Sequence, residues 1–105
     1  MKLVYIAGPY RAMSENQVLL NIIQARSYAL KYWRLGFAVI CPHLNSAFMG
    51  EGPNTDDKFL EGGLELVRRC DVVVMIPGWK QSRGALTEHE LARALSKQII
   101  YEEPK

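Results

Sequence analysis

Two short segments of the sequence combine residues that suit anion binding. The first, Gly8-Pro9-Tyr10-Arg11, has a glycine that permits close approach and a guanidinium that can fork onto a phosphate or carboxylate. The second runs from Pro77 to Gly84 and has Trp79, Ser82 and Gly84 just before a predicted helix, whose free N–H groups and dipole favour an anion. Together the two segments predict a site for an anionic ligand.

A carboxylate follows closely on the second segment. Glu88 stands one turn into the predicted helix, with Glu90 beyond it. A carboxylate in the first turns of a helix that faces a ligand crevice can act as a nucleophile or a base. The alternative is structural, because a glutamate near a helix start also favours the dipole and caps backbone donors. Trp79 likewise has two interpretations, stacking on a base or packing as a rim aromatic on the last helix.

Alternating strand-like and helical patterns position these segments. Strands are predicted over Lys2–Ala7, Phe37–Cys41, Asp71–Ile76 and Gln98–Tyr101, helices over Ser14–Gly36, Asp56–Arg69 and Gly84–Ser96, and a long loop over His43–Thr55. This alternation predicts a three-layer α/β/α fold with a four-stranded parallel sheet in the flavodoxin-like order 2-1-3-4. In such a sheet ligands bind beyond the carboxyl ends of the strands, where the order reverses. That point lies between the first and third strands, which the two anion-binding segments follow.

Composition limits the function classes. The 105 residues suit a single domain, residues 1–105, and 13 basic against 11 acidic side chains give a charge of only +2, which argues against binding of duplex nucleic acid. Neither GxGxxG nor a Walker P-loop is present, so the classical dinucleotide and ATP sites have no support. No apolar stretch is long enough for a signal peptide or a membrane span, and no metal-ligand spacing occurs. With Cys41 and Cys70 as reduced core thiols, a cytoplasmic location is expected.

Three features of the predicted helices and loops bear on packing. In Ser14–Gly36 a core stripe of Val18, Ile22, Ala25, Ala29 and Trp33 is accompanied by a second apolar strip of Leu19, Ile23 and Leu30. That strip indicates either a subunit interface or a wider buried face. The pair Gly62-Gly63 weakens its helix by about 1 kcal/mol per residue, which indicates that something other than propensity placed it. Of the histidines, His43 is predicted to be structural rather than a ligand contact, and His89 to be exposed.

Three runs carry a family resemblance over essentially the whole chain. They are Tyr5-Ile6-Ala7-Gly8-Pro9-Tyr10-Arg11, Cys70-Asp71-Val72-Val73-Val74, and Ser82-Arg83-Gly84-Ala85-Leu86-Thr87-Glu88 followed by Ala92 and Lys97. In combination they resemble the nucleoside 2-deoxyribosyltransferase superfamily, most closely its small phage and bacterial members of unknown function and the deoxynucleotide N-hydrolases. The resemblance implies cleavage, by hydrolysis or transfer, of the N-glycosidic bond of a (deoxy)nucleoside or its 5'-monophosphate. It implies no metal and no organic cofactor.

The resemblance also assigns roles to single residues. Glu88 matches the glutamate that attacks the anomeric carbon to form a glycosyl-enzyme ester, whereas Glu90 is out of register. Tyr5 matches the tyrosine that positions this nucleophile. Arg11 and Ser82 match the arginine and serine that hold the 5'-phosphate in the nucleotide-hydrolysing branch, and they belong to the two segments that predict an anion site.

One position departs from the family pattern. Relatives commonly carry an aspartate eight positions before the aspartate that matches Asp71, where this chain has Gly63. Glu61 and Glu65 are no obvious substitutes, because a shift of two residues turns a helical side chain by about 200°. Asp56 or Asp57, the acids at the end of the predicted long loop where the next helix begins, could replace it. The alternative function is therefore a non-catalytic nucleotide-binding or sensing protein that has lost this second carboxylate.

The resemblance finally suggests an assembly. Relatives often complete their pocket with residues of a longer C-terminal segment or of a neighbouring subunit. The second apolar strip offers a surface for such a partner. We therefore expect a homodimer or larger homo-oligomer with a shared active site.

Overall fold

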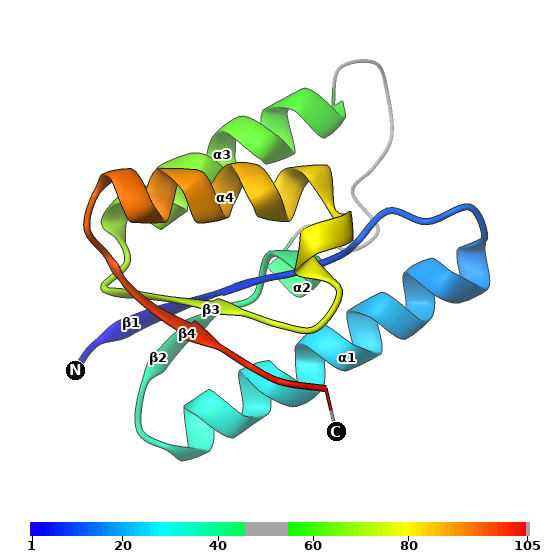
Figure 1. Ribbon diagram of the computed structural model, residues 1–105. Helices are drawn as coiled ribbons and strands as arrows, with labels where there is room; N and C mark the ends of the chain where they lie inside the picture. Colours follow the sequence, from blue (N-terminus) through cyan, green and yellow to red (C-terminus); the bar gives the residue numbers. More distant parts are fainter. Residues whose placement is uncertain (46–54, 105) are drawn as a thin grey trace.

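The computed structural model describes residues 1–45 and 55–104 (Figure 1). Its elements, in chain order, are β1 (Leu3–Ala7), α1 (Glu15–Arg34), β2 (Ala38–Ile40), α2 (Pro42–Asn45), α3 (Thr55–Arg69), β3 (Val72–Met75), the short 3-10 helix η1 (Trp79–Gln81), α4 (Arg83–Ala94) and β4 (Gln98–Tyr101). The predicted strands and long helices are all present, with ends that move by one or two residues. This is the usual uncertainty of helix and strand ends.

The four strands form one parallel sheet in the order β2-β1-β3-β4, which confirms the predicted order. β1 pairs with β3 from Val4 opposite Val72 to Ala7 opposite Met75. Both strands are apolar and rich in β-branched residues, as expected of parallel strands covered on both faces. Their carboxyl ends meet at the point where the strand order reverses.

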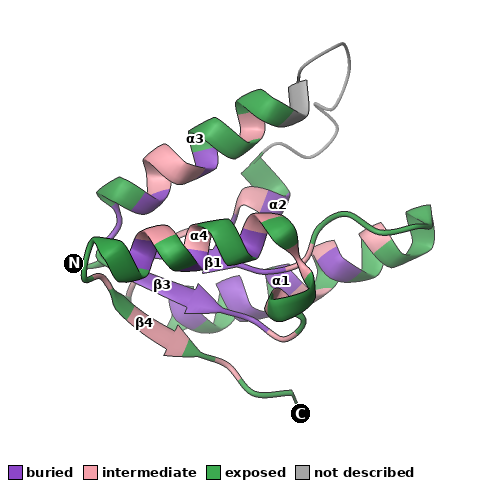
Figure 2. Ribbon diagram, turned by 45° about the horizontal axis from the view of Figure 1, so that its top comes forward, coloured by how far each residue is buried: buried purple, intermediate pink, exposed green. Residues whose placement is uncertain are grey.

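Helices cover both faces of the sheet, α1 on one side and α3 with α4 on the other (Figure 1). Because side chains alternate along a strand, Val4 and Ile6 pack on the α1 side, whereas Tyr5 and Ala7 pack on the side of α3 and α4. Figure 2 shows β1 and β3 buried between these layers. The alternation therefore directs Tyr5 towards the layer that carries Glu88.

Helix α1 buries Ala25 and Ala29, as predicted, but the rest of its buried stripe differs from the prediction. Tyr28 and Tyr32 lie in the core, and the prediction that Trp33 lies there is wrong, since it is 54% exposed. Trp33 is at the edge of a stripe centred on Ala25 and Tyr32, because successive residues are about 100° apart around a helix. The second apolar strip lies on the opposite side and does not widen the buried face; its exposed fractions are 55% for Leu19, 51% for Ile23 and 37% for Leu30.

Two further expectations concern loops and thiols. The predicted loop His43–Thr55 begins as helix α2, with Pro42 at its first position, where proline is favoured; residues 46–54 lie outside the described residues. Cys41 and Cys70 are free and buried, as predicted. Among the described residues no helix has both the length and the apolar character of a membrane span.

Candidate active site

The centre of the candidate site is a pair of side chains from two different layers. Tyr5, in the middle of β1, is fully buried, and its hydroxyl donates a hydrogen bond to Oε2 of Glu88 on α4. Glu88 is placed by the start of α4, where Ser82 caps the helix through a 3.2 Å hydrogen bond from the Ala85 N–H to its Oγ. The structure thus brings together the two residues predicted to be catalytic.

Burial controls the protonation of this pair. It raises the pKa of the Glu88 carboxyl to about 7, although the hydrogen bond from Tyr5 acts in the opposite direction. Burial and the neighbouring Glu88 charge raise the pKa of the Tyr5 phenol far above its usual range, so Tyr5 is a hydrogen-bond donor at all physiological pH values. A carboxyl group with a pKa near neutrality beside a fixed donor is typical of catalytic acids, bases and nucleophiles.

Helix α3 brings Gly63 against the same pair. A Cβ atom at this position would lie 2.9 Å from the Tyr5 hydroxyl oxygen and 3.4 Å from Oε2 of Glu88. Position 63 therefore adjoins the Tyr5–Glu88 pair, and a residue without a side chain occupies it. The carboxylate that the family resemblance would place there is absent.

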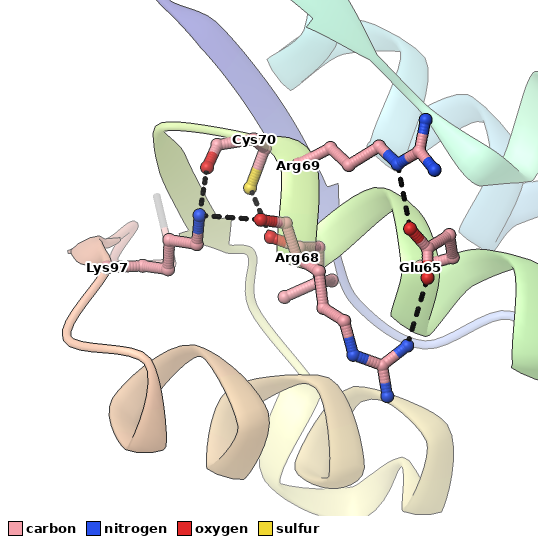
Figure 3. Close-up of polar contacts among 6 residues, drawn as sticks. Glu65, Arg68, Arg69, Cys70 and Lys97 are labelled. Carbon is pink, nitrogen blue, oxygen red and sulfur yellow. Dashed lines mark hydrogen bonds and ion pairs between the residues drawn. The ribbon is translucent and has the colours of Figure 1, made fainter.

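The neighbouring glutamates of α3 are engaged elsewhere. Glu65 accepts hydrogen bonds from Nε of Arg69 at 2.7 Å and from a terminal nitrogen of Arg68 at 3.3 Å (Figure 3). Glu61 lies 3.8 Å from Nζ of Lys58, and its side chain is 71% exposed. Neither substitutes for a carboxylate at position 63, as the helical geometry predicted.

The two aspartates proposed as replacements begin the same helix. Asp57 is exposed at the start of α3, away from the buried core. The side chain of Asp56 lies outside the described residues. A contribution of either acid to the site stays a prediction.

The two predicted anion-binding segments lie side by side, but their glycines have packing roles. A Cβ on Gly8 would overlap Cγ1 of Ile76, so Gly8 is needed for the close packing of the ends of β1 and β3. Gly78 has a φ of +92°, and a Cβ there would lie 3.0 Å from Pro9. Contact with Ile76 therefore requires a glycine at position 8, whether or not a ligand binds there.

Helix α1 supplies two positioning residues that the sequence did not reveal. The side-chain amide of Asn21 donates to the Tyr10 carbonyl at 3.0 Å, and that of Gln24 donates to the Pro77 carbonyl at 2.9 Å. Each anion-binding segment is thus tied to α1. Asn21 is 8% exposed, so its amide needs such partners, but no pattern in the sequence marked it.

The predicted phosphate-binding residues lie at the ends of these segments. Ser82 is partly buried and engaged as the cap of α4, while Gly84 in the first turn has open space where a side chain would be. Arg11 is exposed in the connection from β1 to α1. The first turn of α4 remains the natural position for an anion, because the N–H groups of a helix start have no intrahelical partners.

Trp79 packs on α4, as one of its two interpretations predicted. Its ring centroid lies 4.5 Å from that of His89 and 5.8 Å from that of Tyr101. His89 is only 8% exposed and shares a 2.7 Å hydrogen bond with the Tyr101 hydroxyl, so the prediction that His89 is exposed is wrong. Trp79 and Tyr101, which lie outside helix α4, cover His89, and the helical pattern alone could not show this.

His43 also has a structural role. It is 5% exposed and donates from Nε2 to the Pro9 carbonyl at 2.9 Å, which ties α2 to the segment after β1. Burial lowers the pKa of His43, so the ring is neutral near pH 7. Within the described residues no group of three or more His, Cys, Asp or Glu side chains could hold a metal ion.

A cavity of about 250 Å³ lies away from this site. It is lined by residues of α1, β2 and α2, including Leu30, Trp33 and Leu44. These elements lie on the α1 side of the sheet and at its β2 edge, whereas Tyr5 and Glu88 lie between the sheet and the helices α3 and α4. The chemistry-bearing residues therefore do not coincide with this cavity.

The strand order and the Tyr5–Glu88 pair define a parallel α/β protein with a candidate site between its sheet and the helices α3 and α4. Residues 2–101 match the family described as "Domain of unknown function (DUF4406)", and the chain belongs to that family. A search of curated proteins gave no match. Among solved structures, the chain is similar to the CMP N-glycosidase BcmB of Clostridium botulinum, with 20% sequence identity, a TM-score of 0.56, and coverage of 95% of this chain and 67% of that chain. At this identity the similarity concerns the fold, which it corroborates.

Proposed function

We propose that the protein cleaves the N-glycosidic bond of a (deoxy)nucleoside or its 5'-monophosphate, with Glu88 as the nucleophile. The observation that carries the proposal is the hydrogen bond between the buried Tyr5 hydroxyl and Glu88, whose carboxyl has a pKa of about 7. The fold shared with a CMP N-glycosidase supports the reaction class. A relationship to the nucleoside 2-deoxyribosyltransferase superfamily is part of this proposal.

The proposed reaction has two steps. The ionised Glu88 carboxylate attacks the anomeric carbon, the C–N bond breaks, and its electron pair leaves with the base, which takes up a proton from solvent. Water, or a second base in a transfer reaction, then attacks the same carbon; the ester bond to Glu88 breaks, the carboxylate is regenerated, and the proton of the attacking group passes to solvent. Tyr5 holds the carboxylate in one orientation throughout. The steps proposed here require neither a metal nor an organic cofactor.

The substrate's phosphate belongs at the start of α4. Backbone N–H groups and the helix dipole favour a negative charge there, and Ser82 and Arg11 are the side chains that we propose for its recognition. Gly8, Pro9, Trp79 and Gly84 complete the proposed substrate-binding surface. We propose that Trp79 offers an aromatic face on which the base stacks.

The experiment is a substrate panel. The protein is incubated with CMP, with other ribo- and deoxyribonucleoside 5'-monophosphates and with the corresponding nucleosides, and free base is measured by liquid chromatography. Release of base from at least one substrate class is expected. No release from any member by a folded protein contradicts the enzymatic proposal.

Gly63 favours a second candidate function. Because position 63 adjoins Tyr5 and Glu88 without a carboxylate, the protein could bind a nucleotide without cleaving it. Titration calorimetry with the same panel separates the two functions. Saturable binding of a nucleotide that is recovered intact after prolonged incubation supports a binding or sensing protein.

We also propose that the chain forms a homodimer or larger homo-oligomer in the cytoplasm. The strip of Leu19, Ile23 and Leu30 is exposed on α1 and offers an apolar surface to a second copy. This strip and the Tyr5–Glu88 pair lie on opposite sides of the sheet. The strip itself therefore does not adjoin the Tyr5–Glu88 pair within one chain.

A further inference from the structure

The two adjacent glycines of α3 have opposite surroundings. Gly62 is exposed, and a Cβ placed there meets nothing within 4 Å. Gly63 is buried, and a Cβ placed there would lie 2.9 Å from the Tyr5 hydroxyl oxygen, closer than real Cβ contacts come. Glycine disfavours the interior of a helix, so its presence there calls for a packing reason. Gly63 has such a reason in its contact with Tyr5, and Gly62 has none.

Both the Tyr5 ring and helix α3, which meet at this contact, are held in place by other contacts. Tyr5 is 0% exposed in the central strand β1, so its ring is held by core packing. Helix α3 is held by Val67, which is fully buried in the same cluster. Its last turn is held by Lys97, whose Nζ donates to the carbonyls of Arg68 at 2.8 Å and Cys70 at 2.7 Å (Figure 3). A side chain at position 63 must therefore strain this packing, and the atom that it meets first is the Tyr5 hydroxyl oxygen.

We propose that Gly63 is a positioning residue: its missing side chain lets the backbone of α3 close against the Tyr5 hydroxyl and keeps that hydroxyl hydrogen-bonded to Glu88. The steric part of this inference stands on the contact alone, and its catalytic consequence rests on the proposed function. The inference gives a steric reason for the absence of a carboxylate at position 63. The Tyr5 hydroxyl occupies the space in which an aspartate side chain would begin, so position 63 is not simply a vacated acid site.

The ionisable groups around Tyr5 and Glu88 determine how a displaced Tyr5 hydroxyl would change the pKa of Glu88. On α3, Glu65 is paired with two arginines, and on α4 His89 contacts Tyr101 while Glu90 is exposed. Burial raises the pKa of Glu88, and the hydrogen bond from Tyr5 lowers it. Displacing the hydroxyl therefore removes the lowering influence.

The hydroxyl itself faces other ionisable groups besides Glu88. The buried thiols of Cys70 and Cys41 also raise the pKa of Tyr5, more weakly than Glu88 does. All of these neighbours keep the phenol protonated. Its protonation is therefore constant over the pH range of the test, and only its position changes.

A double-mutant cycle tests the steric claim without reference to activity. Gly63→Ala and the matched control Gly62→Ala are each made in the original chain and in a Tyr5→Phe background, and the urea midpoint of unfolding is measured. In the original chain Gly62→Ala raises the midpoint, because alanine favours the helix, and Gly63→Ala lowers it. In the Tyr5→Phe background, where the hydroxyl is absent, both substitutions are expected to raise the midpoint.

Two results would overturn the inference. One is that Gly63→Ala and Gly62→Ala shift the midpoint equally in the original chain, which would mean that no contact exists. The other is that Gly63→Ala lowers the midpoint as much in the Tyr5→Phe background as in the original chain, which would mean that the hydroxyl plays no part. A chain that fails to fold as Gly63→Ala but folds as Gly63→Ala with Tyr5→Phe gives the expected answer.

The pH dependence of kcat/KM tests the catalytic consequence. Gly63→Ala is expected to move the acidic limb to higher pH, so that kcat/KM falls by about tenfold on that limb for each pKa unit and recovers at alkaline pH. Gly62→Ala leaves the limb in place. A uniform loss at every pH would contradict a positioning role. If the original chain releases no base at all, the proposed function fails, while the folding cycle still decides the steric claim.

Discussion

At Glu88 the fold holds a carboxyl group where ionisation costs free energy. Burial between the sheet and α4 raises its pKa to about 7, and only the Tyr5 hydroxyl offsets this. As the nucleophile that we propose, Glu88 is protonated below neutrality and gains reactivity as the pH rises. The same displacement of the pKa must appear in the stability of the protein, because folding and proton binding are linked.

The raised pKa of Glu88 therefore makes the free energy of unfolding depend on pH. Between about pH 4.5 and 7 the folded state keeps a proton on Glu88 that the unfolded state has lost, so this group's contribution to stability falls as the pH rises through that window. Glu88→Gln removes the effect and should raise the free energy of unfolding at pH 8 by about 2 to 3 kcal/mol relative to the original chain. Urea unfolding at several pH values measures it.

Two controls separate the effect of Glu88 from that of other titrating groups. Burial lowers the pKa of His43, which gives an opposite slope below its ordinary pKa, so the difference between the original chain and Glu88→Gln is the informative quantity. Glu90→Gln alters a carboxylate two residues further along whose side chain is 72% exposed, and it should leave the profile unchanged. Parallel profiles for the original chain and Glu88→Gln would show that Glu88 titrates normally.

At the scale of elements, the start of α4 serves the fold and the proposed site together. Ser82 ends the connection from β3, caps α4 through its Oγ and lies beside the open first turn at Gly84. Ser14 caps α1 in the same way, through a 3.1 Å hydrogen bond from the Gln17 N–H. The two serines thus form a matched pair, of which only Ser82 lies in the proposed phosphate site.

Replacing each cap by alanine separates the two roles. Ser82→Ala and Ser14→Ala should each lower the free energy of unfolding by about 1 kcal/mol, because each leaves a helix N–H without its side-chain acceptor. Only Ser82→Ala should weaken the binding of a nucleoside 5'-monophosphate relative to the nucleoside, measured by calorimetry or by KM. An equal loss of affinity for both ligands, or the same loss in Ser14→Ala, would remove Ser82 from the phosphate site.

The sequence predicted the elements well because strong local patterns determine them. The apolar run around Val73 and the caps Ser14 and Ser82 fix the strands and helices, and the alternation fixes the parallel order. Side-chain rotation around α1 was predicted less well. The pattern assigned Trp33 to the core, but Tyr28 and Tyr32 are buried there and Trp33 is exposed.

The candidate site was predictable only in part. Tyr5 and Glu88 were identified through the family resemblance, and strand alternation explains why they meet. Their hydrogen bond, the clamps from Asn21 and Gln24, and the contact at Gly63 depend on long-range packing between elements distant in sequence. Local periodicity contains no information about such contacts, so only the folded structure could reveal them.

At the scale of the whole molecule, the two faces of the sheet are covered by different helices. One face carries the Tyr5–Glu88 pair under α3 and α4, and the other carries α1 with its exposed apolar strip. The strip lies on the side of α1 opposite its buried stripe, where solvent or a second copy covers it. This arrangement leaves the candidate site and the proposed interface on separate surfaces of the chain.

The proposed homo-oligomer can be tested through this strip. Light scattering coupled to size-exclusion chromatography should give at least twice the mass of one chain, and Ile23→Glu, which places a charge on the strip, should reduce it to the single-chain mass. Glu15→Gln, a change in the first turn of the same helix, serves as the control. A monomer at high concentration in the original chain would contradict the proposal.

Glu88 is the residue on which the proposed chemistry depends. The most direct measurement is the rate of base release from the best substrate of the panel by the original chain, by Glu88→Gln and by Glu90→Gln. We expect Glu88→Gln to lose activity by about a thousandfold or more, as when a nucleophile is removed, whereas Glu90→Gln retains it. Equal release by the original chain and by folded Glu88→Gln would contradict a catalytic role for Glu88.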